Sequence, residues 1–85
     1  MLRLTKKAEY GIIALKHMLN KPTGIVTSAK EISETYSIPS EIMAKILQIL
    51  ARKGLIESSQ GAKGGYVLAK GGDTISLADI VESLE

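Results

Sequence analysis

The chain has 85 residues, a formal net charge of +2, hydrophobic residues at 45% and no cysteine. This length predicts one domain with a modest core, because small domains bury a smaller share of their surface. The lack of cysteine excludes disulfides and cysteine-ligated metals within this chain, and its single histidine cannot form a metal site alone. With no signal-peptide pattern and no apolar run of membrane-spanning length, we expect a soluble cytoplasmic domain that does not contact a membrane.

Charge is distributed unevenly along the chain. Residues 1–70 hold all 11 basic side chains against five acids, whereas residues 71–85 hold four acids and no base. A basic region of this kind favours a polyanionic partner, with the acidic tail lying away from it. A solvated surface with scattered lysines explains the charge equally well.

The first predicted helix begins after Thr5, a suitable N-cap, and runs to about Asn20. Its apolar residues recur at spacings of 4, 3 and 4, which predicts one buried stripe that Ile13 and Met18 could widen. The residues of this stripe are Ala8, Ile12, Leu15 and Leu19.

A second, shorter helix follows a turn. Ile25 and Val26 form a candidate short strand, and Ser28 with Glu31 has the pattern of a capping box, in which each residue satisfies the other's free amide. We expect the helix that starts there to end near Thr35.

The third predicted helix, over residues 40–53, is the element around which the chain is organised. Pro39 and Ser40 suit a helix start, and Gly54 behind two cations suits a helix end. One side carries a predicted buried stripe of Met43, Ile46, Leu47 and Leu50. The other side carries a hydrogen-bonding strip with little bulk, formed by Ser40, Glu41, Ala44, Lys45 and Gln48. Two helices of about eight and fifteen residues joined by a short turn have the proportions of a helix-turn-helix.

Ile42 and Ile49 fall outside that buried stripe. We expect them to extend the core beneath the first helix or the hairpin. The alternative is that they meet a further helix or a partner subunit, since contiguous exposed apolar surface marks an interface.

A glycine-rich hairpin comes next, with strands over 55–59 and 66–69 and a loop over 60–65. A phosphate-binding loop would be followed by a helix, whereas a strand follows here, so the loop is better interpreted as a wing with Lys63 at its tip. A last helix is predicted from Ser76, with Ile80, Val81 and Leu84 turned towards the core. Residues 1–85 are thus predicted to form a single, mainly α domain with a small β-hairpin, a winged helix-turn-helix.

Four segments together resemble the Rrf-type winged-helix transcription regulators, which include IscR-like, NsrR-like and CymR-like proteins. They are residues 4–10, residues 38–56, the loop 61–66 with Leu68, and residues 75–77 followed by Ile80. The resemblance implies sequence-specific binding to double-stranded promoter DNA, as a homodimer that regulates transcription. In that family the helix matching 40–53 enters the major groove and the loop matching 60–65 is the wing. We expect repression as the output.

The chain departs from the family pattern at three points. Gln60 stands where many members carry Arg; it can still hydrogen-bond but supplies no charge for a minor-groove contact. Ala44 stands where the IscR-like protein has Glu, so base preference should differ from that relative. Sensing members continue past the position of Glu85 into a segment with three cysteines and a long dimerisation helix. We therefore expect that this chain holds no cofactor and that its homodimer is weakened. The chain is expected to be either a DNA-binding portion of a longer regulator or a short family member.

The candidate DNA contacts divide into two sets. The base-reading set is Ser40, Glu41, Ala44, Lys45 and Gln48, in which Lys45 suits guanine and Gln48 suits adenine. The backbone or wing set is Lys7, Tyr10, Thr27, Ser28, Lys30, Gln60 and Lys63. Each backbone candidate has an ordinary alternative, since Ser28 could be only a cap, Tyr10 only core and the lysines only solvated.

Enzymatic activity is not expected. The chain has one His, no Cys, and no acid and base at a spacing that suggests cooperation. The alternative function is a winged helix that docks to a partner protein without specific DNA binding.

Overall fold

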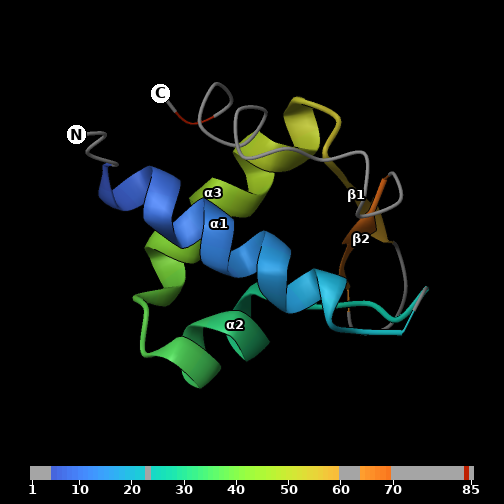
Figure 1. The fold of residues 1–85 in the computed structure, drawn as a ribbon, viewed down its shortest axis with the longest axis horizontal. Helices are drawn as coiled ribbons and strands as arrows, with labels where there is room; N and C mark the ends of the chain where they lie inside the picture. The colour runs from blue at the N-terminus through green and yellow to red at the C-terminus, as the bar shows by residue number, and fades with distance from the viewer. Residues whose placement is uncertain (1–4, 23, 60–63, 70–83, 85) are drawn as a thin grey trace.

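The computed structural model describes residues 5–22, 24–59, 64–69 and Leu84. Its elements follow the order α1 (Lys6–Leu19), α2 (Ala29–Tyr36), α3 (Ser40–Arg52), β1 (Ile56–Ser59) and β2 (Gly65–Leu68). The three helices pack together, and the hairpin lies beside them at the end of α1 far from the N-terminus (Figure 1). The predicted mainly α fold with a small hairpin, a winged helix-turn-helix, is confirmed.

Helix α1 begins as predicted. The Thr5 side chain accepts a hydrogen bond of 3.1 Å from the Ala8 amide, and the C-cap is Asn20. The predicted burial is correct for Ala8 and Leu15. It is wrong for Leu19, since 44% of this residue is exposed. Leu19 is the last residue of the helix, and there Met18 takes the packed position instead. The buried residues of α1 are Ala8, Gly11, Ala14, Leu15 and Met18.

Half of the predicted capping box is present at the start of α2. The Glu31 amide donates to Ser28 Oγ at 3.1 Å. The Glu31 carboxylate does not complete the box, because it bonds to side chains of α1 and of the turn that follows α1. Helix α2 ends at Tyr36, one residue later than predicted, where Ser37 takes a left-handed conformation with φ of 57°.

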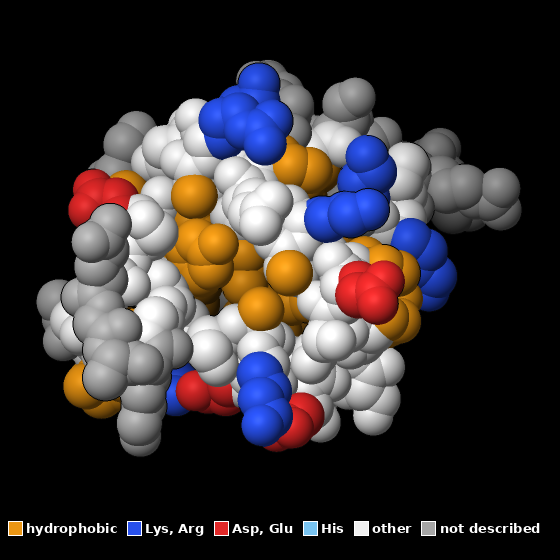
Figure 2. Space-filling view, turned by 180° about the vertical axis from the view of Figure 1, so that it is seen from behind, with side chains coloured by type: hydrophobic (Ala, Val, Ile, Leu, Met, Phe, Trp, Pro, Cys, Tyr) orange, Lys and Arg blue, Asp and Glu red, His pale blue; other side chains and the backbone are white. Residues whose placement is uncertain are grey.

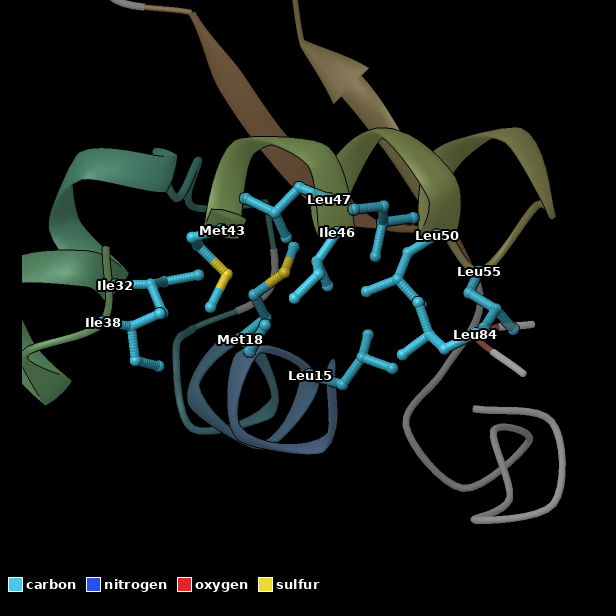
Figure 3. Close-up of a cluster of buried hydrophobic side chains, with 12 residues drawn as sticks. Leu15, Met18, Ile32, Ile38, Met43, Ile46, Leu47, Leu50, Leu55 and Leu84 are labelled. Carbon is cyan, nitrogen blue, oxygen red and sulfur yellow. The ribbon is translucent and has the colours of Figure 1, made fainter. Parts of the chain in front are cut away.

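The buried stripe of α3 is confirmed at every predicted position. Met43, Ile46, Leu47 and Leu50 are each at most 1% exposed, and they face Leu15 and Met18 of α1 across the core (Figure 3). Ile32 and Ile38 close the core near α2, while Leu55 and Leu84 close its other end. Gly54, at φ of 84°, ends the helix region as predicted.

The two strands pair antiparallel, with Ile56 opposite Leu68 and Ser59 opposite Gly65. The predicted strand at residues 25–26 is wrong, because both side chains are exposed and neither residue belongs to a strand. Instead, Thr27 forms an isolated bridge with Tyr66 through backbone hydrogen bonds of 2.9 and 2.8 Å. The segment before α2 is thereby tied to the hairpin.

Two predictions concern the C-terminal region and the wing. Leu84 is 5% exposed and belongs to the core, as expected. The rest of the predicted last helix, with Ser76, Ile80 and Val81, lies outside the described residues. Residues 60–63 of the wing loop also lie outside them.

Candidate nucleic-acid interface

Helix α3 presents the predicted base-reading strip on its outer side. Ser40, Glu41, Lys45 and Gln48 are exposed, and Ala44 is half-buried. The opposite side of α3 is held against the core, so the strip has a fixed orientation. An exposed helix face carrying an amide, an ammonium, a carboxylate and a hydroxyl has the groups that read base edges in a major groove.

An open groove of about 660 Å³ separates the start of α2 from the start of α3. It brings Lys30 of the predicted backbone set together with Ser40, Glu41 and Ala44 of the base-reading set. Its remaining lining residues are Ala29, Ser33 and Glu34. Seen from behind Figure 1, the molecule shows a face with hydrophobic side chains in a hollow in its middle and both basic and acidic side chains around it (Figure 2).

Three other backbone candidates occupy different environments. Lys7 is exposed and Tyr10 half-buried on α1, and with Lys45 they line a second groove, between α1 and α3. Ser28 is half-buried and caps α2. Gln60 and Lys63 lie outside the described residues.

Thr27 differs from the other candidates because it is only 1% exposed. Its hydroxyl has no hydrogen-bond partner within the described part of the chain. The structure therefore places its side chain in the interior. No local sequence pattern shows this, because the burial arises from the bridge to Tyr66.

The second groove contains residues that the sequence analysis did not assign to it. Its volume is about 340 Å³, and its lining is Lys6, Lys7, Tyr10, Ile42, Lys45, Ile46 and Ile49. The expectation that Ile42 extends the core is wrong, since it is 41% exposed, whereas Ile49 is half-buried against the core. The seven-residue spacing of Ile42 and Ile49 is the sequence feature that indicates this apolar surface.

A polar cluster fastens α1 to α2. His17 Nε2 and Lys21 Nζ each lie 2.6 Å from Glu31 Oε2, and His17 Nδ1 lies 2.8 Å from the Tyr36 hydroxyl. The hydrogen bond from His17, followed by that from Lys21, lowers the pKa of Glu31. The cluster fixes where α2 lies relative to α1, and neither partner of Glu31 could be inferred from periodicity.

The sequence profile of the Rrf2 family, described as iron-dependent transcriptional regulators, matches residues 4–85. The chain belongs to the Rrf2 family. Among solved structures, the global cysteine regulator CymR of B. subtilis is 33% identical, with a TM-score of 0.93 over 100% of this chain. Oxidized CymR of Staphylococcus aureus is 31% identical, with a TM-score of 0.90 over 99% of the chain. IscR of T. potens is 31% identical, with a TM-score of 0.80 over 99% of the chain.

The Rrf2 family assignment confirms the resemblance found in the sequence. The chain spans 66%, 68% and 61% of the lengths of those three structures, in the same order. The matched relatives are transcription regulators rather than enzymes. No helix within the described ranges is long and apolar enough to cross a membrane.

The iron dependence named for the Rrf2 family does not fit the residues of this chain. There is no cysteine, and the lone histidine has both ring nitrogens engaged by Glu31 and Tyr36. Residues 5–22, 24–59, 64–69 and 84 contain no group of three His, Cys, Asp or Glu side chains that could hold a metal ion.

Proposed function

We propose that this chain binds specific sites in double-stranded promoter DNA, as a homodimer, and represses transcription. Helix α3 enters the major groove, and the loop over residues 60–65 contacts the backbone or the minor groove. The observation that carries the proposal is the exposed strip of α3 beside Lys30, on a chain that belongs to a family of transcription regulators.

Each residue of the strip has a suitable base partner. Gln48 can bond two atoms of adenine, and Lys45 can donate to the acceptors of guanine. Glu41 can accept a hydrogen bond from the cytosine amino group, and Ala44 can pack against a thymine methyl. The Ser40 hydroxyl can bond to either a donor or an acceptor on a base edge. These contacts discriminate between sequences because every base pair shows a different pattern in the major groove.

The backbone set holds the helix in register. Lys30 and Lys7 supply cations, Tyr10 and Ser28 supply hydroxyls, and phosphates bind favourably near the start of a helix such as α2. Gln60 and Lys63 of the wing extend the contact along the duplex. Thr27 acts through its backbone, by holding Tyr66 of β2 next to the start of α2.

The test is selection of bound sequences from a randomised duplex pool at near-physiological salt. The wild-type chain should enrich a two-fold symmetric consensus, because a symmetric dimer reads two equivalent half-sites. A variant carrying Lys45→Ala and Gln48→Ala should lose the consensus, and Lys16→Ala, which removes an exposed lysine of α1 outside both grooves, should keep it.

Other outcomes separate the parts of the proposal. A single unsymmetric half-site would support DNA reading and contradict the homodimer. An absence of enrichment, together with salt-tolerant binding to a protein, would contradict DNA reading and indicate a docking module. Increased transcription from a reporter promoter that carries the selected site would contradict repression.

A further inference from the structure

The groove between α1 and α3 has an apolar interior, and its isoleucines take no part in the proposed DNA contacts. Ile42, Ile46 and Ile49 of α3 line it together with Tyr10 of α1. Ile42 is 41% exposed, and it would be covered only if something entered the groove. Contact between water and exposed apolar surface is unfavourable, so an apolar group that displaced this water would bind favourably.

Three lysines, Lys6, Lys7 and Lys45, also line this groove. The ion pairs within the described part of the chain all involve Glu31, so none of these lysines is paired with an acid there. No carboxylate is among the lining residues. Lys6 Nζ lies 5.9 Å from the centre of the Tyr10 ring, a cation–π distance that places its charge beside the apolar wall.

We propose that this groove binds an amphipathic organic anion, a carboxylate attached to an apolar chain or ring. Its volume of about 340 Å³ lies within the range of roughly 300–1,000 Å³ that is usual for small-molecule sites. The apolar part covers Ile42 and Ile49, and the carboxylate accepts charge-assisted hydrogen bonds from the lysines.

This ligand class fits better than either of two simpler ones. A phosphate of DNA would satisfy the lysines but leave the isoleucines in water. A neutral apolar molecule would cover the isoleucines but leave the lysines unpaired. Only a ligand with both parts matches the charge and the apolar lining together.

Occupancy of the groove has a consequence for DNA binding, which rests on the proposed function. Lys45 belongs to the base-reading strip and Lys7 to the backbone set, and both line the groove. A bound carboxylate would pair with these lysines and compete with DNA for them. The ligand therefore weakens DNA binding, and the groove is an effector site.

The first experiment titrates the ¹⁵N-labelled chain with decanoate and follows the amide resonances by NMR, with no DNA present. We expect shifts concentrated at residues 6–10 and 42–49. Ile42→Gln should weaken binding about tenfold through lost apolar contact, and Lys6→Gln should weaken it about threefold through lost charge. The matched controls are Leu19→Gln, which alters an exposed apolar residue of α1 outside the groove, and Lys16→Gln; both should bind decanoate like the wild type.

Decanol provides the ligand control, because it has the same chain without the charge. Binding of decanol as tight as that of decanoate would overturn the requirement for an anion. Shifts that are absent, or that persist unchanged in Ile42→Gln, would overturn the site. If decanoate fails while an acidic amphipathic helical peptide shifts the same resonances, the small-ligand proposal is wrong and the groove docks a protein.

The second experiment measures competition with DNA by fluorescence anisotropy on the selected duplex. Decanoate should lower the DNA affinity of the wild-type chain, and it should have little effect on Ile42→Gln, whose DNA affinity without decanoate should be unchanged. Unaltered DNA affinity of the wild type at saturating decanoate would overturn the effector role. If the chain binds decanoate but no DNA, the ligand site is supported. The proposed function and the competition with DNA are then both contradicted.

Discussion

His17 of α1 and Glu31 of α2 are joined by a contact of 2.6 Å between Nε2 and Oε2, although 14 residues separate them. The other ring nitrogen of His17 meets the Tyr36 hydroxyl, and the two rings pack edge to face with centroids 5.4 Å apart. Both ends of α2 are thus bonded to one side chain of α1. This contact sets the position of α2 within the helix-turn-helix.

The Glu31 carboxylate should make stability depend on pH in the acid range. Its pKa is lowered from the ordinary value of 4.5 by the hydrogen bond from His17 and then by Lys21. A lowered pKa in the folded state means that the ionised carboxylate stabilises the fold above pH 4.5, and that this stabilisation is lost as the pH falls through the folded-state pKa. Glu31→Gln should cost about 0.2–1 kcal/mol at pH 7, because the pair is partly exposed.

Thermal unfolding followed by circular dichroism between pH 3 and pH 7 checks this prediction. The loss of Tm on acidification should be smaller in Glu31→Gln than in the wild type. Glu34→Gln is the matched control, because it alters an exposed carboxylate on the same helix. Equal pH dependence in wild type and Glu31→Gln would show that the cluster does not contribute.

Gly65→Ala should disturb the junction between the hairpin and the segment before α2. A Cβ at Gly65 would lie 2.4 Å from Val26 Cγ1 and 2.8 Å from the Thr27 carbonyl oxygen, and the residue has φ of +141°. We expect a loss of about 1–3 kcal/mol from the steric conflict, in addition to backbone strain. Gly24→Ala, which has a positive φ but open space around it, should lose only the strain. Urea unfolding of the two variants measures the difference, and equal losses would argue against a close approach at Gly65.

Leu47→Ala should be among the most damaging single substitutions. Leu47 is 0% exposed in the centre of the core, and removing such a side chain costs about 2–5 kcal/mol. Leu19→Ala should change the free energy of unfolding by no more than about 0.5 kcal/mol, because Leu19 is exposed. Denaturant midpoints compare the two, and a large loss in Leu19→Ala would indicate a contact beyond those described.

Gln48→Ala should relax sequence preference at one base pair of the bound site. The expected loss of discrimination is about 1–3 kcal/mol at that position, because a two-bond contact to adenine disappears. Anisotropy titrations against the selected site and its single-base variants measure it. Equal weakening on every duplex would assign Gln48 to the backbone instead.

Lys30→Ala should weaken DNA binding uniformly across sequences. Loss of one phosphate contact should flatten the slope of log affinity against log salt by about one unit. Lys63→Ala is expected to do the same if the wing touches the duplex. An unchanged slope in either variant, with Lys16→Ala as control, would remove that lysine from the interface.

The sequence by itself determined the three helices, the hairpin and the inner face of α3. Thr5 and Ser28 cap the two helices that they precede, Gly54 ends the third, and the spacing of Met43 to Leu50 places one stripe inward. These features depend on residues within one or two turns of each other, so local patterns predict them. The family resemblance and the order of helices and hairpin also follow from the sequence.

Only the tertiary structure decided which apolar and polar side chains have neighbours. Leu19 lies on the predicted buried stripe of α1, and Ile42 is expected to extend the core although it lies off the stripe of α3, but both side chains are exposed. Thr27 is a polar residue that becomes buried by pairing with Tyr66. The Glu31 carboxylate contacts His17 of α1 instead of completing the capping box of its own helix. Such outcomes depend on the packing of segments far apart in the chain, and periodicity within one segment carries no information about them.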